Sequence, residues 1–504
     1  MRIPLSESSS TPLSAPSAAP LRRRAAIAFA ALSIACTGPD AALDARAADA
    51  HAPDAKALYA EHCASCHGVR RYGGYAPPLI PNTLSRKSDE ELTQAIREGL
   101  PNTQMPPFAA KFDRAALPGL VALLREPVGD IRWSLEDIAA SRVEEPMAAG
   151  AIPPEISREN LTLVVERGAG AVVVLDGDTL KELDRFAVGG RIHGGVKFDL
   201  GFHRALAATR DGTVVDYDLD RGALRTRVKA GVNTRNIAVS RKGDFVAATN
   251  QLPPGLVLFD GRLRPLRILP LDGQPSGVYQ LPGRDRFIMT LRDRPLLYTI
   301  SQPELEVKTR ELPEPFEDFV FVPGTRRLVA SSRGGSRLLL YDWEKHEVLA
   351  SLPTQGLPHL FSACFFSQGE KLYAAFNHMG AARLSIIEME RFQVVKDIPL
   401  VGSGYFARTH SGTPYLWIDT NSEEIQLVDK ATLEPLTRTL RPQEGKKAMH
   451  VEFTADGSRA LVSIWHPEGA VVVYDSATLE EVARIPYAMP VGKYNAGNKT
   501  RSLR

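Results

Sequence analysis

From Leu161 onward, apolar and polar positions follow a pattern that repeats about every 40 to 46 residues. Each copy has three or four apolar residues, an acidic residue in most cases, a short turn and a strand of alternating character. Several short strands at this period are typical of propeller blades, so eight copies predict an all-β, eight-bladed propeller. The copies are Val172–Asp176, Val214–Asp218, Leu256–Asp260, Leu296–Ile300, Leu338–Asp342, Leu384–Glu388, Ile425–Asp429 and Val471–Asp475.

Each copy reads as four strands, and the two ends of the repeat are incomplete in complementary ways. Three strands are expected at the start, within 161–186, and one strand, Val491–Asn495, is left over at the end. Together they make one blade, so we expect the ends of the chain to close the ring on each other. In the first complete copy the expected strands are Gly195–Asp199, Ala205–Thr209, Val214–Leu219 and Ala223–Val228.

The register of the repeat locates a candidate site. About 17 residues after each anchor lies the position just before the innermost strand, at the axial end of a blade. A longer loop, Arg441–Lys447, moves this position to His450 in the seventh copy. The other residues at this position are His193, Arg235, Gly277, Glu317, His359, Tyr405 and Gly492.

Three histidines, an arginine and a tyrosine are thus expected at one mouth of the central channel. Imidazoles around a broad channel favour a large planar metal cofactor. Zinc held by His193, His359 and His450 is the alternative, because imidazole is a common zinc ligand.

Upstream of the repeat, residues 51–128 predict a small all-α domain. An alanine-rich amphipathic segment, Ala55–His62, leads into Cys63-Ala64-Ser65-Cys66-His67, the C-x-x-C-H motif of covalently bound haem c. The thiols of Cys63 and Cys66 are expected to bind the haem vinyl groups and His67 the iron. Further helices are expected over Asp89–Gly99 and Asp113–Arg125.

Met105 lies in the proline-stiffened segment Asn102–Phe108. A thioether there suits the sixth iron position of an electron-transfer haem, and the alternative is a packing residue. A domain of this size with both axial positions filled transfers electrons, which implies a redox reaction elsewhere in the molecule.

The first 47 residues read as a signal peptide. Arg22, Arg23 and Arg24 precede an apolar run to Ala35, and Ala45-Arg46-Ala47 offers a cleavage site, so we expect a periplasmic protein. A disordered tail, or lipidation at Cys36, are the alternatives. Residues 129–155, rich in proline, alanine and glycine, are expected to link the helical domain to a propeller over 156–504.

Charge and cysteine content exclude other classes. Without residues 1–47, basic and acidic residues are equal in number, so nucleic acid is not an expected partner. No run of 18 apolar residues predicts a transmembrane span. Cys364 lies in an apolar run and is expected to be a buried free thiol, so no disulfide framework is implied.

Residues 51–128 resemble class I cytochromes c, and most of 51–504 resembles the cytochrome cd1 nitrite reductase family. The matching segments are Ile192-His193 through Arg210-Asp211-Gly212, Thr234-Arg235-Asn236, Leu357-Pro358-His359 and Asn377-His378-Met379-Gly380. The resemblance implies His67 and Met105 as axial ligands of haem c. It implies His193 as the iron ligand of haem d1, with Arg210 and Arg235 binding its carboxylates.

One departure from the family bears on function. Nitrite reductases of this family use two distal histidines; His359 matches one, but Asp318 stands in the segment of the other. His450 and Tyr494 are expected to face the same pocket, which resembles the family's dihydro-haem d1 dehydrogenase branch. That resemblance implies oxidation of a propionate side chain to an acrylate, the last step of haem d1 biosynthesis for denitrification, with electrons passed to haem c.

In this interpretation His450 is the proton acceptor, Tyr494 positions the side chain or relays a proton, and His359 orients the pocket or binds the distal face. The expected partners are dihydro-haem d1, a periplasmic electron acceptor, and nitrite reductase as recipient of haem d1. A nitrite reductase and a non-catalytic haem d1 carrier are the competing hypotheses. The covalent haem c argues against the carrier, and Asp318 argues against the reductase.

Overall fold

The computed structural model describes residues 54–85, 87–100, 105–111, 113–146, 152–332 and 336–503. The expected signal peptide, with Cys36 and the cleavage sequence Ala45-Arg46-Ala47, lies outside the described residues. In the part of the chain that is described, no helix combines the length and apolar character that a bilayer crossing requires.

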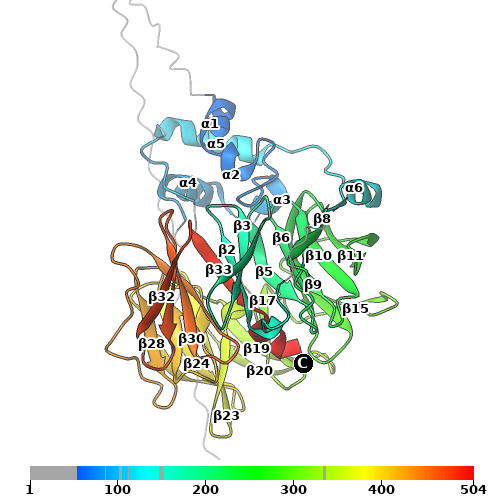
Figure 1. The fold of residues 1–504 in the computed structure, drawn as a ribbon. Coiled ribbons are helices and arrows are strands. Elements are labelled where there is room, and N and C mark those ends of the chain that lie inside the picture. Colours follow the sequence, from blue (N-terminus) through cyan, green and yellow to red (C-terminus); the bar gives the residue numbers. More distant parts are fainter. Residues whose placement is uncertain are drawn as a thin grey trace, which may run out of the picture. The chain divides into compact units, whose positions relative to one another are not determined.

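Short helices surround an apolar core in the first described region, as the sequence predicts (Figure 1). Tyr59, Leu120 and Leu124 are buried together in this core. Helix α4 starts at a capping box, because Glu91 donates its N–H to the Ser88 hydroxyl and accepts the Ser88 N–H in return. The helices are α1 (Ala55–His62), α2 (Ala64–His67), α3 (Pro81–Leu84), α4 (Asp89–Glu98), the 3₁₀-helix η1 (Arg114–Ala116) and α5 (Leu117–Arg125).

The segment expected as a linker contains regular structure. Helix α6 (Leu135–Ala140) buries Ile138 completely, and strand β1 (Val143–Glu144) pairs antiparallel with β8 (Ala223–Lys229). The indole N–H of Trp133 donates to the Lys229 carbonyl at 3.0 Å. These contacts attach residues 133–144 to the neighbouring sheet.

Strands in the described residues form eight sheets, which confirms the eight-bladed propeller (Figure 1). We number the blades from the first complete one along the chain. Blade 1 holds β5 (Ile192–Phe198), β6 (Arg204–Thr209), β7 (Thr213–Asp218) and β8; blade 2 holds β9 (Asn233–Val239), β10 (Phe245–Leu252), β11 (Pro254–Asp260) and β12 (Pro265–Pro270); blade 3 holds β13 (Pro275–Gln280), β14 (Arg286–Leu291), β15 (Leu296–Ser301) and β16 (Val307–Glu311); blade 4 holds β17 (Asp318–Phe321), β18 (Arg327–Ser331), β19 (Arg337–Asp342) and β20 (Glu347–Pro353).

The remaining blades differ in strand number. Blade 5 holds β21 (Leu357–Pro358), β22 (Cys364–Gln368), β23 (Lys371–Met379), β24 (Ala381–Glu388) and β25 (Gln393–Pro399); blade 6 holds β26 (Ala407–Arg408), β27 (Tyr415–Asp419) and β28 (Ile425–Asp429); blade 7 holds β29 (Ala448–Phe453), β30 (Arg459–Ile464), β31 (Ala470–Asp475) and β32 (Glu481–Pro486); blade 8 holds β33 (Pro490–Asn495), β2 (Leu161–Glu166), β3 (Ala171–Asp176) and β4 (Glu182–Ala187). The 3₁₀-helices η2 (Arg158–Asn160), η3 (Leu360–Ser362) and η4 (Arg501–Leu503) and helix α7 (Ala496–Thr500) complete the described elements.

Blade 8 confirms the predicted ring closure. The C-terminal strand β33, red in Figure 1, pairs antiparallel with β2, so that Tyr494 lies opposite Leu163. The last strand of the chain thereby completes the sheet that the first strands begin.

Blade 6 has fewer regular strands than the four expected. Beyond β28 the chain makes only isolated bridges, Ile425 with Leu440 and Val428 with Pro435. Proline has no N–H to donate, so Pro435 interrupts a continuous outer strand.

The acidic residue of the repeat has a structural role. The Asp176 carboxylate accepts the backbone N–H groups of Asp178 and Thr179, and Asp475 does the same for Ala477 and Thr478. Such side-chain-to-backbone bonds stabilise tight turns. The recurring acid therefore marks the turn between the third and fourth strands and is not a catalytic residue.

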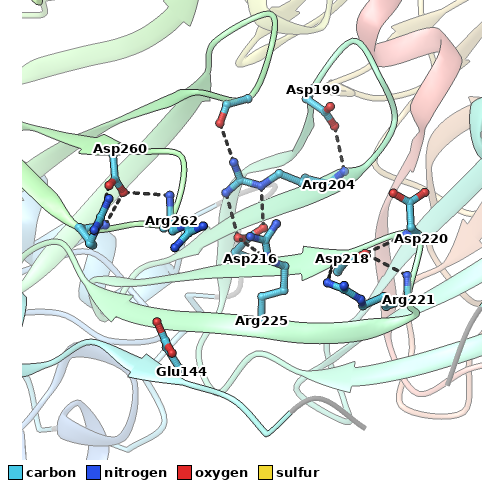
Figure 2. Close-up of polar contacts among 12 residues, drawn as sticks. Glu144, Asp199, Arg204, Asp216, Asp218, Asp220, Arg221, Arg225, Asp260 and Arg262 are labelled. Atoms are coloured by element: carbon cyan, nitrogen blue, oxygen red, sulfur yellow. Dashed lines mark hydrogen bonds and ion pairs between the residues drawn. The ribbon is translucent and has the colours of Figure 1, made fainter. Parts of the chain in front are cut away.

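A buried ion pair holds blade 1 together. Arg204 donates through Nε and Nη2 to both Asp216 oxygens, at 3.1 and 2.9 Å, and through Nη1 to the Gly243 carbonyl of blade 2 (Figure 2). Its own backbone N–H donates to the Asp199 carboxylate at 2.8 Å. The side chain of Asp216 is fully buried, so its charge depends on Arg204 and on Arg225, whose Nε lies 3.8 Å from Asp216 Oδ2.

Replacing Asp216 by alanine is expected to lower the free energy of unfolding by about 3–5 kcal/mol, because it leaves a buried guanidinium without its carboxylate. Thermal denaturation of the holoprotein measures the loss. Asp220→Ala provides the control, since it removes surface pairs with His203 and Arg158 that are worth about 0–1 kcal/mol each. Equal losses in the two variants would contradict the importance of the buried pair.

Candidate functional site

The C-x-x-C-H motif lies at the junction of α1 and α2, and its side chains are suited to binding haem c. Cys63 ends α1, Cys66 and His67 lie on α2, and both thiols are free. His67 is buried and donates its Nδ1–H to the Pro77 carbonyl at 2.8 Å, which leaves the lone pair on Nε2 for an iron. Burial lowers the pKa of His67, which keeps the ring neutral. These residues fit a covalently bound haem c.

Met105 packs against the same apolar core as Cys63 and Tyr59. Its role as the sixth ligand stays a prediction. Met105→Ala is expected to lower the midpoint potential of haem c, since methionine ligation raises it. Redox titration of the purified holoprotein tests this, with Leu84→Ala as a packing control from the same core. An unchanged potential in Met105→Ala would show that Met105 is a packing residue.

The candidate residues in the propeller coincide with irregularities of the innermost strands. In blades 1, 2, 3, 7 and 8 the register between the first and second strands shifts at the expected position. Such β-bulges redirect side chains and are common beside active sites. The residues at these bulges are His193, Arg235, Gly277, His450 and Gly492.

The bulges correct one detail of the prediction. His193 lies on β5, Arg235 on β9 and His450 on β29, whereas the sequence placed them before these strands. A bulge lets the strand continue past the irregular residue, which the repeat pattern does not reveal. The side chain of His193 is not among those that the structure describes.

His450 and Tyr494 lie together, as expected. Their ring centroids are 5.5 Å apart in an edge-to-face arrangement, and the Phe406 ring lies 4.6 Å from His450 on another side. His359 lies 6.0 Å from Phe406, so these aromatic and imidazole rings from blades 5 to 8 are continuous. The structure therefore brings together the three residues predicted as catalytic.

The two imidazoles hold their protons on different nitrogens. Nδ1 of His359 contacts the Tyr405 carbonyl at 2.7 Å, so it donates and the lone pair lies on Nε2. Nδ1 of His450 instead accepts the Lys493 backbone N–H at 3.3 Å, so its ring proton lies on Nε2. Burial, followed by the nearby charges of Lys493, Arg408 and Lys499, lowers the pKa of His450 well below its usual range. His450 thus offers a neutral N–H donor, and His359 offers a lone pair.

Two lysines lie beside these rings, and the repeat pattern does not predict them as site residues. Lys493 is completely buried, and its ammonium donates to the Ser463 hydroxyl at 2.5 Å. Lys499 lies 5.5 Å above the Tyr494 ring and pairs with Glu452 at 2.6 Å. Burial raises the pKa of Tyr494 to about 12, so its hydroxyl is neutral in the resting protein. The sequence shows that Lys493 lies within a strand, but it does not show that this lysine lies next to the site.

Two glycines give Tyr494 its place. A Cβ atom on Gly492 would lie 2.4 Å from the Tyr494 hydroxyl oxygen, and one on Gly195 would lie 2.5 Å from the ring. Both distances are far inside van der Waals contact. Gly195 also has a φ of +77°, a conformation that other residues adopt at a cost. Gly195 follows His193 by two residues, so the strand that carries the expected iron ligand also packs against the tyrosine.

Asp318 binds the segment that carries His359. Its Oδ2 accepts the backbone N–H of Phe361, in η3, at 2.9 Å. Burial raises the pKa of Asp318, while the neighbouring His359 lowers it. The buried carboxylate of Asp318 therefore has a partner in the polypeptide backbone.

Three arginines form a cationic group on the opposite blades. Arg210 donates to the Gln251 side chain at 2.7 Å, and Arg235 donates to the Ser276 carbonyl. Burial, followed by the charges of Arg235 and Arg292, lowers the pKa of Arg210 to about 9. Burial and Arg292 lower that of Arg235 to about 10. Cations that repel one another in this way are suited to a ligand with several carboxylates.

Arg292 was missed by the sequence prediction. It lies just after β14 and pairs with Glu317 of the next blade. Arg292 follows the second strand of its blade, whereas the repeat pattern that identifies Arg235 considers only the position beside the first strand. Among the described side chains, no group of three His, Cys, Asp or Glu residues is arranged to hold a metal ion.

Comparisons with known proteins agree with both regions. The "Cytochrome D1 heme domain" family model matches residues 156–499, and the model "Cytochrome C oxidase, cbb3-type, subunit III" matches residues 50–124. Dihydro-heme d1 dehydrogenase of Pseudomonas aeruginosa is 40% identical over 463 residues, covering 88% of this chain and 94% of that protein. Nitrite reductase of Stutzerimonas stutzeri is 21% identical, covering 88% and 92%.

A solved structure is also similar over most of the chain. It is the dihydro-heme d1 dehydrogenase NirN in complex with DHE, with a TM-score of 0.74 and 38% identity, covering 88% of this chain and 99% of that one. The helical domain with its C-x-x-C-H motif, the eight-bladed ring and the extensive sequence identity all indicate the same family. The chain therefore belongs to the cytochrome d1 haem-domain family, with a c-type cytochrome domain ahead of the propeller.

Proposed function

We propose that this protein is a dihydro-haem d1 dehydrogenase, which oxidises one propionate of its substrate to an acrylate. The observation that carries the proposal is the contact of His450 with Tyr494, together with the bond of Asp318 to the Phe361 amide in the segment that carries His359. The activity of the 40% identical relative, a dihydro-heme d1 dehydrogenase, supports it.

The reaction removes two hydrogens from adjacent carbons. Two C–H bonds break, a C=C bond forms, two protons pass to the protein and then to water, and two electrons leave singly through the substrate's iron. Haem c, held by Cys63, Cys66 and His67, supplies a one-electron acceptor when bound. An external periplasmic acceptor completes the turnover.

The residues of the pocket divide the remaining tasks. His193 and, through its free Nε2, His359 are the iron ligands that we propose, while Arg210 and Arg235 bind carboxylates. The sequence suggested His450 as proton acceptor, but its Nδ1 already accepts a backbone N–H and its Nε2 carries the proton. We therefore assign His450 the role of donor to the substrate or to Tyr494. Tyr494 is the group that we propose beside the reacting carbons, where its hydroxyl oxygen takes up the substrate proton as its own proton passes to water.

Anaerobic mixing of the purified holoprotein with dihydro-haem d1 tests the function. The visible spectrum is expected to change to that of haem d1 while haem c becomes reduced. The nitrite reductase hypothesis predicts instead fast nitrite turnover by the protein loaded with haem d1, and the carrier hypothesis predicts binding without oxidation. Either result would contradict the proposal.

Location and partners follow from the same proposal. The signal peptide expected over 1–47 and the covalent haem c support a periplasmic location. Nitrite reductase is the expected recipient of the product. Fractionation of cells that express the full chain tests the location, and haem d1 transfer to the apo reductase tests the partner.

A further inference from the structure

Asp419 lies at the end of β27, in blade 6, and is 1% exposed. Its Oδ1 accepts the backbone N–H groups of Tyr405 and Phe406, at 2.6 and 3.0 Å. Its Oδ2 accepts the backbone N–H of His450 in blade 7, at 3.1 Å. One buried carboxylate thus joins the Tyr405–Phe406 segment of blade 6 to the backbone of His450 in blade 7.

We propose that Asp419 is a positioning residue that fixes both distal imidazoles, His359 and His450, in their complementary donor and acceptor states. This inference deepens the proposed dehydrogenase function and rests on it. Asp419 itself acts through backbone amides and is not proposed to contact the substrate.

The backbone of His450 shows why such a restraint is needed. Its φ is +52°, in the left-handed region that few residues other than glycine adopt. Non-glycine residues stay in this region only where their surroundings determine it. The bond from Asp419 holds the His450 N–H, and the Lys493 N–H holds Nδ1 of the ring. Both contacts depend on the bulged conformation of β29.

The connection to His359 runs through the Tyr405–Phe406 peptide. Asp419 holds the N–H groups of these two residues, while the Tyr405 carbonyl accepts the Nδ1–H of His359. The preceding Gly404 lies so close that a Cβ atom there would overlap the Asp419 carbonyl oxygen. The turn is therefore packed tightly around Asp419, and a shift of this turn displaces the acceptor of His359.

Both oxygens of the Asp419 carboxylate accept N–H groups, so an asparagine at this position cannot keep all three hydrogen bonds. In Asp419→Asn one oxygen becomes an NH₂ group, which must face either the His450 N–H or the two N–H groups of the turn. Two donors then meet, and one segment is released. The rings are expected to move by a distance that costs about 100-fold in rate, since misplacement of about 1 Å has that effect.

The experiment compares Asp419→Asn and Asp419→Glu with the wild-type holoprotein. For the asparagine variant we expect kcat for acrylate formation to fall about 100-fold with KM changed less than about threefold. Where the Tyr405–Phe406 turn is the segment released, the spectrum of bound dihydro-haem d1 is expected to change, because the Tyr405 carbonyl no longer holds His359. A crystal structure of this variant is expected to show His450 outside the left-handed region or the Tyr405 carbonyl away from His359. Asp419→Glu, which keeps the carboxylate, is expected to recover part of the rate.

Asp199→Asn is the matched control. Asp199 is also buried, also accepts a backbone N–H and also has a pKa raised by burial, but it lies beside Arg204 (Figure 2). It should lose stability without a change in the spectrum of bound substrate. If Asp419→Asn and Asp199→Asn show the same kcat and spectrum, the positioning role is wrong.

Failure of the proposed function is a separate result. If the wild-type protein binds dihydro-haem d1 without oxidising it, the dehydrogenase assignment falls. The spectra of bound ligand and the crystal structure then still decide the role of Asp419. If Asp419→Asn does not fold, the structure and spectrum of Asp419→Glu decide it, because the longer side chain must shift the His450 amide or the Tyr405–Phe406 turn. Unchanged imidazole positions with a shifted carboxylate would overturn the proposal.

Discussion

Tyr494→Phe is expected to lower acrylate formation by about 10²–10⁴-fold while dihydro-haem d1 binds with near-normal affinity. The hydroxyl is the only group that this change removes, and the ring stays between Gly195 and Gly492. Stopped-flow absorbance under anaerobic conditions measures the rate, and spectral titration measures the affinity. Tyr487→Phe is the control, because Tyr487, between β32 and β33, is also buried but donates to Glu182.

His450→Ala separates the two candidate roles in the same assay. Since its Nδ1 accepts the Lys493 N–H, His450 is not expected to be the proton acceptor, and we expect a loss of about 100-fold, at the low end of the range for Tyr494→Phe. A larger loss in His450→Ala than in Tyr494→Phe would restore His450 as the proton acceptor. Full activity in both variants would contradict the proposed catalytic site.

His193→Ala is expected to abolish stable binding of dihydro-haem d1 and to leave the haem c spectrum unchanged. The iron would lose the ligand that we propose for it, whereas Cys63, Cys66 and His67 belong to another part of the chain. Added imidazole should restore part of the binding to His193→Gly. His203→Ala is the control, because His203 lies on the same blade but is exposed and pairs with Asp220. Normal binding by His193→Ala would show that another residue holds the iron.

The sequence predicts the architecture because the repeat records it directly. Turn aspartates such as Asp176 and Asp475 recur because the same hydrogen bonds recur, and the apolar strands between them determine the count of blades. Ring closure follows from a strand missing at one end and left over at the other. Blade 6 departs from the pattern where Pro435 removes a donor from its outer strand.

Site residues at register positions are predictable, but their chemistry is not. His450 and His359 are found by counting, yet the nitrogen that carries each proton depends on whether the neighbour is an amide or a carbonyl. Asp419 and Lys493 do not occupy the repeated position just before the innermost strand. Asp419 lies at the end of the second strand of its blade, and Lys493 lies one residue after the position that Gly492 occupies. Arg292 is missed for the same reason. Three-dimensional partners therefore determine the roles that composition and spacing leave open.

The pairing of β33 with β2 has a consequence for biogenesis. Tyr494 lies on β33, which the ribosome makes long after β2, and it reaches the site only when β33 docks beside that first strand of the ring. A chain that is incomplete or still open lacks both the catalytic hydroxyl and the Lys493 amide that orients His450. Assembly of the active site is thus coupled to completion of the fold, so a partly folded molecule cannot begin the oxidation of a reactive tetrapyrrole.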